Sequence, residues 1–189
     1  MVNYGSLMPD GKTHDAITLV GAIAAVPATL LLAPPAWRTD YAAVAILVGA
    51  TLFSGWMLSP DLDLDSSIYH RWGPLRFLWW PYQKLIPHRS FLSHSYLLGP
   101  LLRVTYFVAL TFLLLRVGTY FVHFLFPVDR NTLTREYATF LWDLPCRYPH
   151  LFYAAVIGTL FGTALHVAAD TLVTGFKHVL HGRRRKHRH

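Results

Sequence analysis

Four long apolar stretches dominate this sequence and limit what it can fold into. They cover residues 16–36, 41–58, 97–126 and 151–174. Each approaches or exceeds the roughly 20 apolar residues with which a helix crosses the hydrocarbon core of a bilayer. Only 14% of the 189 residues are charged, whereas a water-soluble domain carries about 25%. The pattern predicts an all-α fold, a multi-pass membrane bundle of about four transmembrane helices in contact with the lipid bilayer.

The connection between the second and third stretches is polar and aromatic. Residues 72–84 mix tryptophan, tyrosine and phenylalanine with arginine and lysine, a composition typical of a short amphipathic helix lying in the membrane interface. A plain structured loop is the alternative. We expect residues 1–176 to form a single membrane-embedded domain.

Positive charge is concentrated at the C-terminus. The net charge is +7, and the last fourteen residues hold six Lys and Arg and no acid. Such a tail, residues 177–189, favours contact with anionic lipid headgroups on the cytoplasmic side. Nucleic-acid binding is disfavoured, because no aromatic residues alternate with these basic ones.

The distribution of Lys and Arg predicts an orientation. With four spans, both termini and the second connection share one side, which holds eleven of the seventeen Lys and Arg residues. The positive-inside rule makes that side cytoplasmic, in the inner (cell) membrane. The connection through residues 127–150 would then face outward as a lid or linker. Arg103 is expected near one interface, and Arg116 toward the other or in the bundle interior.

Acids and histidines occur together in four short segments. Cys146 is the single cysteine, so any metal must be held by His, Asp or Glu. The segments contain His14 and Asp15; Asp61, Asp63 and Asp65; His88 and His94; and His166 and Asp170. In the predicted topology all four reach the membrane at its cytoplasmic side. The sequence therefore predicts one cluster at the inner leaflet.

The residue types in these segments suit a divalent metal. Imidazole nitrogen and carboxylate oxygen bind Zn, Mn, Fe or, with mostly oxygen, Mg, as one or two ions. His166 and Asp170 lie four residues apart and share a helix face, and an ionisable pair inside a span is costly unless it binds something. Asp61, Asp63 and Asp65, if extended, would point the same way. Taken alone, the other segments also fit a helix start, a solvated span end and interfacial histidines.

The ordered set of motifs resembles a known family. It consists of Gly11-Lys12-Thr13-His14-Asp15, Ser59-Pro60-Asp61-Leu62-Asp63, Arg71-Trp72-Gly73-Pro74-Leu75-Arg76, Pro81-Tyr82-Gln83-Lys84 and His88-Arg89-Ser90-Phe91-Leu92-Ser93-His94. The chain resembles, over residues 10–175, a bacterial family of uncharacterised metal-binding membrane proteins. That family is in turn similar to the inner-membrane metal-dependent hydrolases related to the LexA-regulated one. The resemblance implies a metal site and suggests hydrolysis.

The favoured hypothesis is a membrane-bound metal-dependent hydrolase in which the metal activates water. The expected ligands are His14, Asp61, His94, His166 and Asp170, with Asp15, Asp63 and His88 as further ligands or as groups that orient ligands. Arg89 would stabilise charge on a phosphate. The depth of the site favours a phospholipid or lipid-linked phosphoester as substrate.

Two alternatives remain. Ser93-His94 and the His166 to Asp170 motif loosely resemble a metal-free lipid phosphatase, but Thr159-Leu160 stands where that family carries Ser-Arg. The other alternative is a non-catalytic membrane protein that binds, senses or transports metal. Transport would spread ionisable groups along a path through the bilayer, whereas here they gather at one face.

Overall fold

The computed structural model describes residues 11–38, 40–86, 90, 95–126, 129 and 131–186, with side chains for all of these except 36 and 173–186. Helices account for all the regular structure in these ranges. They are α1 (Gly11–Leu32), α2 (Pro35–Arg38), α3 (Tyr41–Met57), η2 (Pro60–Asp63), α4 (Ser67–Arg71), η3 (Gly73–Trp79), α5 (Trp80–Leu85), α7 (Leu98–Leu125), α8 (Thr132–Arg147) and α9 (Pro149–Lys186), where η marks a 3₁₀ helix. The predicted all-α class is confirmed.

Four segments are long and apolar enough to cross a membrane, as predicted. They are Gly11–Leu32, Tyr41–Asp63, Leu98–Leu125 and Pro149–Leu172. The first helix begins earlier than its apolar stretch, so the polar residues from Gly11 to Asp15 form its first turn. It ends before Pro34 and Pro35, because a proline disfavours helical geometry in the residue before it.

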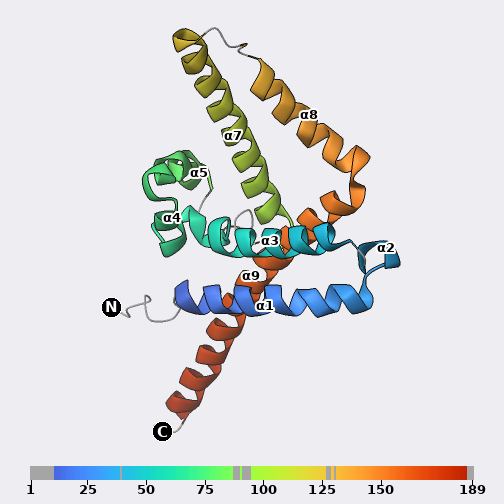
Figure 1. Cartoon of the computed structure of the whole chain (residues 1–189). Coiled ribbons are helices and arrows are strands. Elements are labelled where there is room, and N and C mark those ends of the chain that lie inside the picture. Colours follow the sequence, from blue (N-terminus) through green and yellow to red (C-terminus); the bar gives the residue numbers. More distant parts are fainter. Residues whose placement is uncertain are drawn as a thin grey trace.

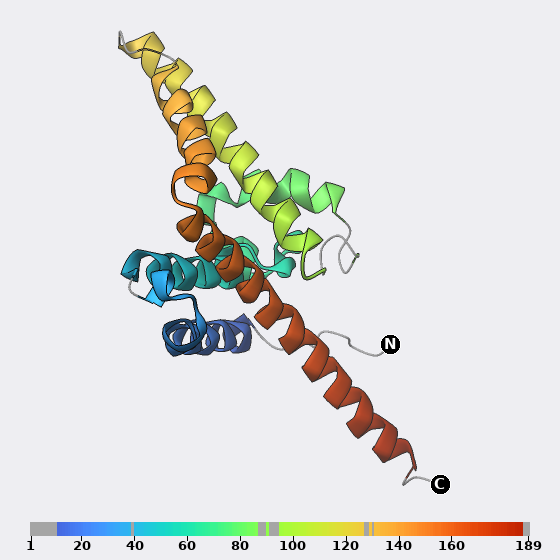
Figure 2. The ribbon, with the colours of Figure 1, turned by 90° about the vertical axis from the view of Figure 1, so that its right-hand side faces the viewer.

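The long helices form two groups (Figures 1 and 2). In the first group α1 and α3 lie side by side, and α9 crosses them in close contact with α3. In the second group α7 and α8 extend together, steeply inclined to α1, to a tip far from it. The four candidate spans therefore do not all run parallel.

Two glycines let α9 approach the backbone of α3. A Cβ added at Gly158 would lie 2.3 Å from the Leu47 carbonyl oxygen, and one at Gly162 would lie 2.4 Å from that of Thr51. This spacing, with a glycine every fourth residue, is common where membrane helices pack closely. The contact fixes which face of α9 turns toward α3, and His166 lies one turn beyond Gly162.

One carboxylate joins the N-terminal end of α3 to the N-terminal end of α9. Asp40 caps α3 by accepting hydrogen bonds from the backbone N–H groups of Ala42 and Ala43, at 2.9 and 3.3 Å. Its other oxygen lies 2.8 Å from Nε2 of His150 at the start of α9. The two helices are thus tied together at the end remote from the predicted cluster.

The segment predicted as one amphipathic helix consists of two short helices, η3 and α5. Trp79 and Tyr82 are buried and pack against Tyr106 of α7, while Phe77 and Trp80 are exposed. The Tyr106 hydroxyl donates a hydrogen bond to the Leu78 carbonyl. The amphipathic pattern is therefore present, and its buried face joins this connection to the start of α7.

Two features of the C-terminal half differ from the expected layout. The expected outward connection contains α8, a helix that the apolar stretches did not reveal because its mean hydropathy is low. The backbone of α9 continues without a break past residue 174, the end of its apolar stretch, to Lys186. At about 1.5 Å per residue this helix is longer than a bilayer core is thick.

Candidate metal centre

Three separate elements supply the central side chains of the predicted cluster. His14 comes from the first turn of α1, Asp61 from the 3₁₀ turn η2 that follows α3, and His166 from α9. One ligand atom from each of these three residues lies within 4.8 Å of the other two. Segments more than a hundred residues apart in sequence thus converge on one point.

Asp170 borders this set through both imidazoles. One carboxylate oxygen lies 3.1 Å from Nε2 of His14, and the other lies 3.5 Å from Nε2 of His166. Nε2 of His166 also lies 3.4 Å from a carboxylate oxygen of Asp61. The two imidazole rings stack with centroids 4.0 Å apart. Nε2 of His166 therefore faces both carboxylates, and Nε2 of His14 faces that of Asp170.

Burial separates the histidines from the acids. His14 is 3% exposed and His166 is 1% exposed, whereas the side chains of Asp61 and Asp170 are 23% and 22% exposed. The site is accordingly closed on its imidazole side and open on its carboxylate side. A ligand would reach it past the two acids.

The imidazoles leave polar atoms unsatisfied in a way that fits a metal. Nδ1 and Nε2 of His166 and Nδ1 of His14 are buried, and no group in the described part of the chain forms a hydrogen bond with them. An unsatisfied buried polar atom costs about 1–3 kcal/mol. A divalent ion bound through the imidazole nitrogens and Asp61 would remove part of that cost. His, His and Asp are also ligand types that zinc, manganese and iron accept.

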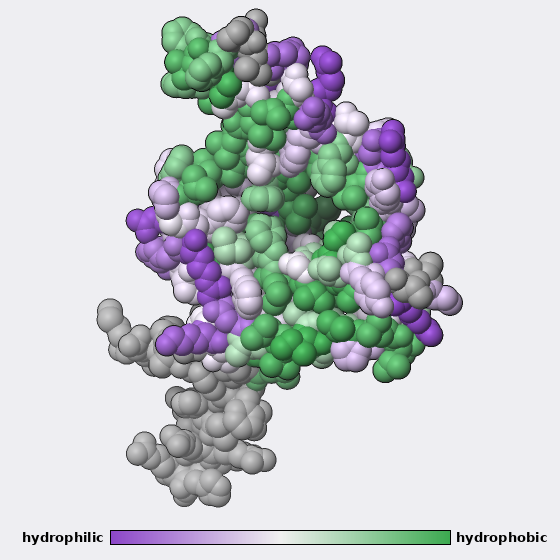
Figure 3. All heavy atoms as spheres, in the orientation of Figure 1, coloured by the Kyte–Doolittle hydropathy of each residue, from purple (hydrophilic) through white to green (hydrophobic). Residues whose placement is uncertain are grey.

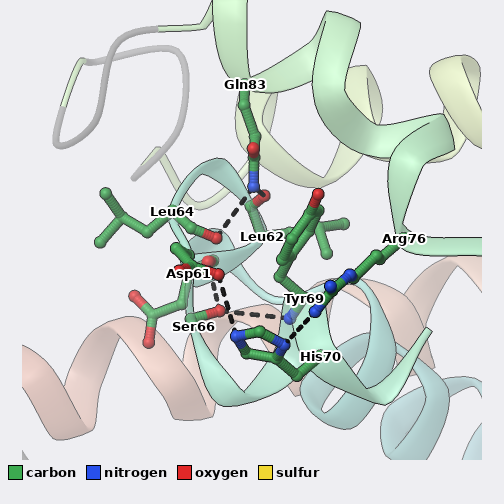
Figure 4. Close-up of polar contacts among 9 residues, drawn as sticks. Asp61, Leu62, Leu64, Ser66, Tyr69, His70, Arg76 and Gln83 are labelled. Carbon is green, nitrogen blue, oxygen red and sulfur yellow. Dashed lines mark hydrogen bonds and ion pairs between the residues drawn. The ribbon is translucent and has the colours of Figure 1, made fainter. Parts of the chain in front are cut away.

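Hydrogen bonds from side chains to backbone carbonyls hold the turn that presents Asp61 (Figure 4). The Gln83 side-chain amide donates to the carbonyls of Leu62 and Leu64, at 3.2 and 2.9 Å. The Ser66 hydroxyl donates to the Asp61 carbonyl at 2.7 Å. The carboxylate of Asp61 points from this turn to Nε2 of His166.

The expectation that Asp61, Asp63 and Asp65 point the same way was wrong. Asp61 and Asp63 lie in a 3₁₀ turn, in which residues two apart do not share a face. Asp63 is buried, and its charge interacts with Arg103. Asp65 is exposed and pairs with His70 at 2.9 Å.

Asp15, which we expected to bind or orient the metal, faces away from the cluster. Its carboxylate pairs with Arg71 of α4, and its backbone carbonyl accepts a hydrogen bond from Nε1 of Trp56 at 3.3 Å. Arg71 also donates to the Trp56 carbonyl at 3.1 Å. Asp15 thus joins α1 to α4 at the position that follows His14. The remaining predicted residues His88, Arg89 and His94 lie outside the described residues.

Arg103 is the site residue that the sequence analysis missed. We expected it near an interface, but its side chain is completely buried (0% exposed) beside the aspartate turn. Arg116, in contrast, lies in the second half of α7 and donates to Oδ1 of Asn131 at 2.6 Å. An ionisable group inside a span is costly unless it is paired or binds something. This argument favours a function for His166 and Asp170, and it applies equally to Arg103.

The fold and the site together define a class: an all-helical protein with four helices able to span a membrane and a His/Asp cluster suited to a divalent ion. The sequence profile of the family described as uncharacterized metal-binding protein (DUF2227) matches residues 9–180. The chain belongs to this family. No curated protein and no solved structure gives a significant match.

Proposed function

We propose that this protein is a membrane-bound metal-dependent hydrolase. The observation that carries the proposal is the set of three convergent ligands, His14, Asp61 and His166, beside a fourth acid on the open side. Catalytic metal sites typically use three protein ligands and keep a position for water or substrate. The resemblance to the inner-membrane metal-dependent hydrolases supports the same reaction class.

A bound divalent ion would supply a Lewis acid and would lower the pKa of its water toward about 7. The residues of this chain do the rest. His14, Asp61 and His166 fix the position of the ion, and Asp170 acts as a fourth ligand or accepts the proton of the attacking water. As the new bond to phosphorus or carbon forms, the bond to the leaving alcohol breaks and that alcohol takes up the proton. Asp63 keeps Asp61 in place through their shared turn.

The substrate we propose is a phospholipid or a lipid-linked phosphoester. The site lies where polar turns meet the ends of apolar helices, so a headgroup would reach the open carboxylate side while its lipid tail stays in the bilayer. We place this site at the cytoplasmic face of the inner membrane, with both termini cytoplasmic, from the Lys and Arg distribution. Arg89 remains our candidate for contacting the phosphate.

A hydrolysis assay on metal-loaded protein tests the proposal. The purified protein is stripped with a chelator, reloaded with Zn²⁺ or Mn²⁺ and offered phosphodiester, phosphomonoester and carboxyl ester lipids in mixed micelles. Turnover should require the metal and should disappear in H166A, while H70A, which alters an exposed His–Asp pair, should keep it. Metal-dependent turnover equal in wild type and H166A would refute the assignment, and activity that survives chelation would favour a metal-free phosphatase.

A non-catalytic role in metal binding, sensing or transport is the second candidate. It is favoured by the family description, which names metal binding and no reaction. Protein that binds metal through the cluster but cleaves none of the lipid esters would fit this candidate. Uptake of the same metal into proteoliposomes, measured on the same preparation, then separates transport from sensing.

A further inference from the structure

A groove of about 600 Å³ runs along the first turns of α1, beside the contact of this helix with α9. Six residues of α1 line it between Lys12 and Gly21, and α9 contributes Leu165. At about 1.5 Å per residue this lining follows α1 for about 14 Å, which is close to half of the roughly 30 Å hydrocarbon core. Along a helix that crosses the bilayer, the groove therefore has the length of one leaflet.

The two ends of the groove differ in polarity. Lys12 and Thr13 line it at the start of α1, and the lining beyond them is apolar, with Ile17, Val20 and Leu165 as its large side chains. Lys12 is exposed, and no acid is among the lining residues. The methylene chain of a lysine packs along apolar surface while its ammonium group stays in the polar region. The groove thus has a cationic end and an apolar body, and an anionic amphiphile has the complementary pattern.

The cationic end lies at the depth of lipid headgroups in the topology that we propose. Lys12 is in the same helical turn as His14, and from the Lys and Arg distribution we place that end of α1 at the cytoplasmic face. Anionic lipids give the cytoplasmic leaflet a negative surface potential, which attracts Lys and Arg. A headgroup at Lys12 would direct its acyl chain along Ile17 and Val20, toward the membrane interior.

The groove ends where α1 and α9 meet. A Cβ added at Gly21 would lie 2.3 Å from Cδ1 of Leu165, so the two helices are in close contact there. Thr13 and Leu165 directly precede His14 and His166 in the sequence. An occupant of the groove would therefore contact both of the helices that carry the buried imidazoles of the metal centre.

The larger hollow between α7 and α8 lacks this pattern. It measures about 900 Å³, and its lining contains Asp129 and no Lys or Arg. A carboxylate repels an anionic headgroup, because like charges repel most strongly where little water screens them. Volume alone therefore does not select an anionic lipid, whereas the lysine at the end of the smaller groove does.

We propose that the groove between α1 and α9 binds one anionic phospholipid. The Lys12 ammonium pairs with the headgroup phosphate, and one acyl chain lies against Ile17, Val20 and Leu165. Because lipid tails are as apolar as leucine, the apolar lining positions the chain but does not choose between lipids. Lys12 makes that choice by its charge. The inference requires neither the metal nor hydrolysis, so its failure and that of the proposed function are separate results.

Photo-crosslinking in nanodiscs tests this inference on the full chain. Nanodiscs of phosphatidylcholine receive a small fraction of phosphatidylglycerol or phosphatidylcholine with a diazirine on one acyl chain, and tandem mass spectrometry locates the labelled residues. In wild type, labelling at Ile17 and Leu165 should be about fivefold stronger with the anionic lipid, the preference expected of one basic residue at a membrane surface. K12Q should lose this preference and label equally with both lipids. K84Q is the matched control, because Lys84 is also exposed but lies outside the groove, and it should keep the preference.

A second pair of variants tests the apolar part of the groove. Val20 is 66% exposed and lines the groove, whereas Leu31 is 71% exposed on the same helix and does not. V20W should fill the groove and abolish labelling at Leu165 with both lipids, and L31W should leave it unchanged.

Three results would overturn the inference. The first is equal labelling of wild type by the two lipids. The second is an anionic preference that survives in K12Q or is lost equally in K84Q, which would indicate general attraction to the membrane surface. The third is suppression of the labelling by excess inorganic phosphate, which would mean that the site binds a free anion and not a lipid.

Discussion

The two helix groups of this protein differ sharply in how they are packed. In the group of α1, α3 and α9, glycines bring backbones together and polar residues are enclosed, including His14, His166 and Thr163. In the group of α7 and α8, the helices diverge around a hollow of about 900 Å³ with an almost entirely apolar lining. Figure 3 shows a hollow lined by apolar side chains near the middle of this face of the molecule.

One group is therefore rigid and closely packed, and the other exposes much apolar surface. A site that needs several side chains held within a few ångströms of one another must lie on closely packed elements, and the His/Asp cluster does. The α7 and α8 pair presents much apolar surface, including Phe121, Phe124 and Trp142, which suits contact with lipid. Its described link to the centre is Arg103, near the beginning of α7. Variants confined to one group test whether the metal centre depends on that group.

Replacing His166 should have the largest effect. In H166A the three-residue ligand set loses its most buried member, and the affinity for Zn²⁺ should fall by at least about a hundredfold, since even orienting partners of ligands are worth 10–100-fold. Elemental analysis of protein dialysed against a metal buffer measures this. H70A is the matched control, because His70 also pairs with an aspartate but is exposed and outside the cluster. Equal metal content in the two variants would show that His166 is not a ligand and that the metal is not bound in the group of α1, α3 and α9.

Asp170 tests how the open side of the centre works. If Asp170 is a fourth ligand, D170N should weaken metal binding about tenfold or more, as loss of a ligand charge does. If it is the proton acceptor, D170N should keep its metal but lose most of its hydrolysis, by about 10²–10⁴-fold. Isothermal titration with Zn²⁺ together with the lipid ester assay distinguishes the two roles. A variant unchanged in both measurements would show that Asp170 is neither a ligand nor the proton acceptor.

A pair of glycine substitutions compares the two groups directly. In G162A the new methyl would lie 2.4 Å from the Thr51 carbonyl oxygen, whereas at Gly118, beside the α7 and α8 hollow, nothing lies within 4 Å. Overpacking at the first position should cost about 1–3 kcal/mol, and alanine at the second should be neutral or stabilising by up to about 1 kcal/mol. Thermal unfolding in detergent, with and without Zn²⁺, measures both. Similar losses in the two variants would contradict the difference in packing.

The sequence predicted the parts of this structure that depend on local composition and on alternation of the spans. Apolar length revealed α1, α3, α7 and α9, and their alternating direction predicted that His14, Asp61, His166 and Asp170 meet. What it could not supply was the geometry of short elements. The alternating aspartates predict an extended segment, whereas Pro60 begins a 3₁₀ turn there. Helix α8 is missed because it lacks the apolar length that reveals the other long helices.

Arg103 shows a different limit. Near the end of an apolar stretch, an arginine can reach the interface with its long side chain, so sequence alone gives no reason to place it inside. Its burial follows from partners that are far away in sequence, Asp63 on one element and Thr163 on another. Such partners can be identified only from the folded structure, whereas His166 and Asp170 can be paired from the sequence because they lie on one helix face.

The smallest effect should come from the contact that joins α7 to α8. The hydroxyls of Thr111 and Tyr137 lie 2.7 Å apart across the two helices. Y137F removes one partner while Thr111 keeps its contacts with the Phe107 and Val108 carbonyls, so the free energy of unfolding should fall by about 0.5–1.5 kcal/mol. The affinity for Zn²⁺ should not change, because the described contacts of Tyr137 do not reach the cluster.

T163V is the comparison variant in the group of α1, α3 and α9. It removes the hydroxyl that accepts a hydrogen bond from Arg103, and it should weaken metal binding measurably. If Y137F weakened metal binding as much as T163V, the α7 and α8 pair would be energetically coupled to the centre, and the division of the molecule into two groups would be wrong.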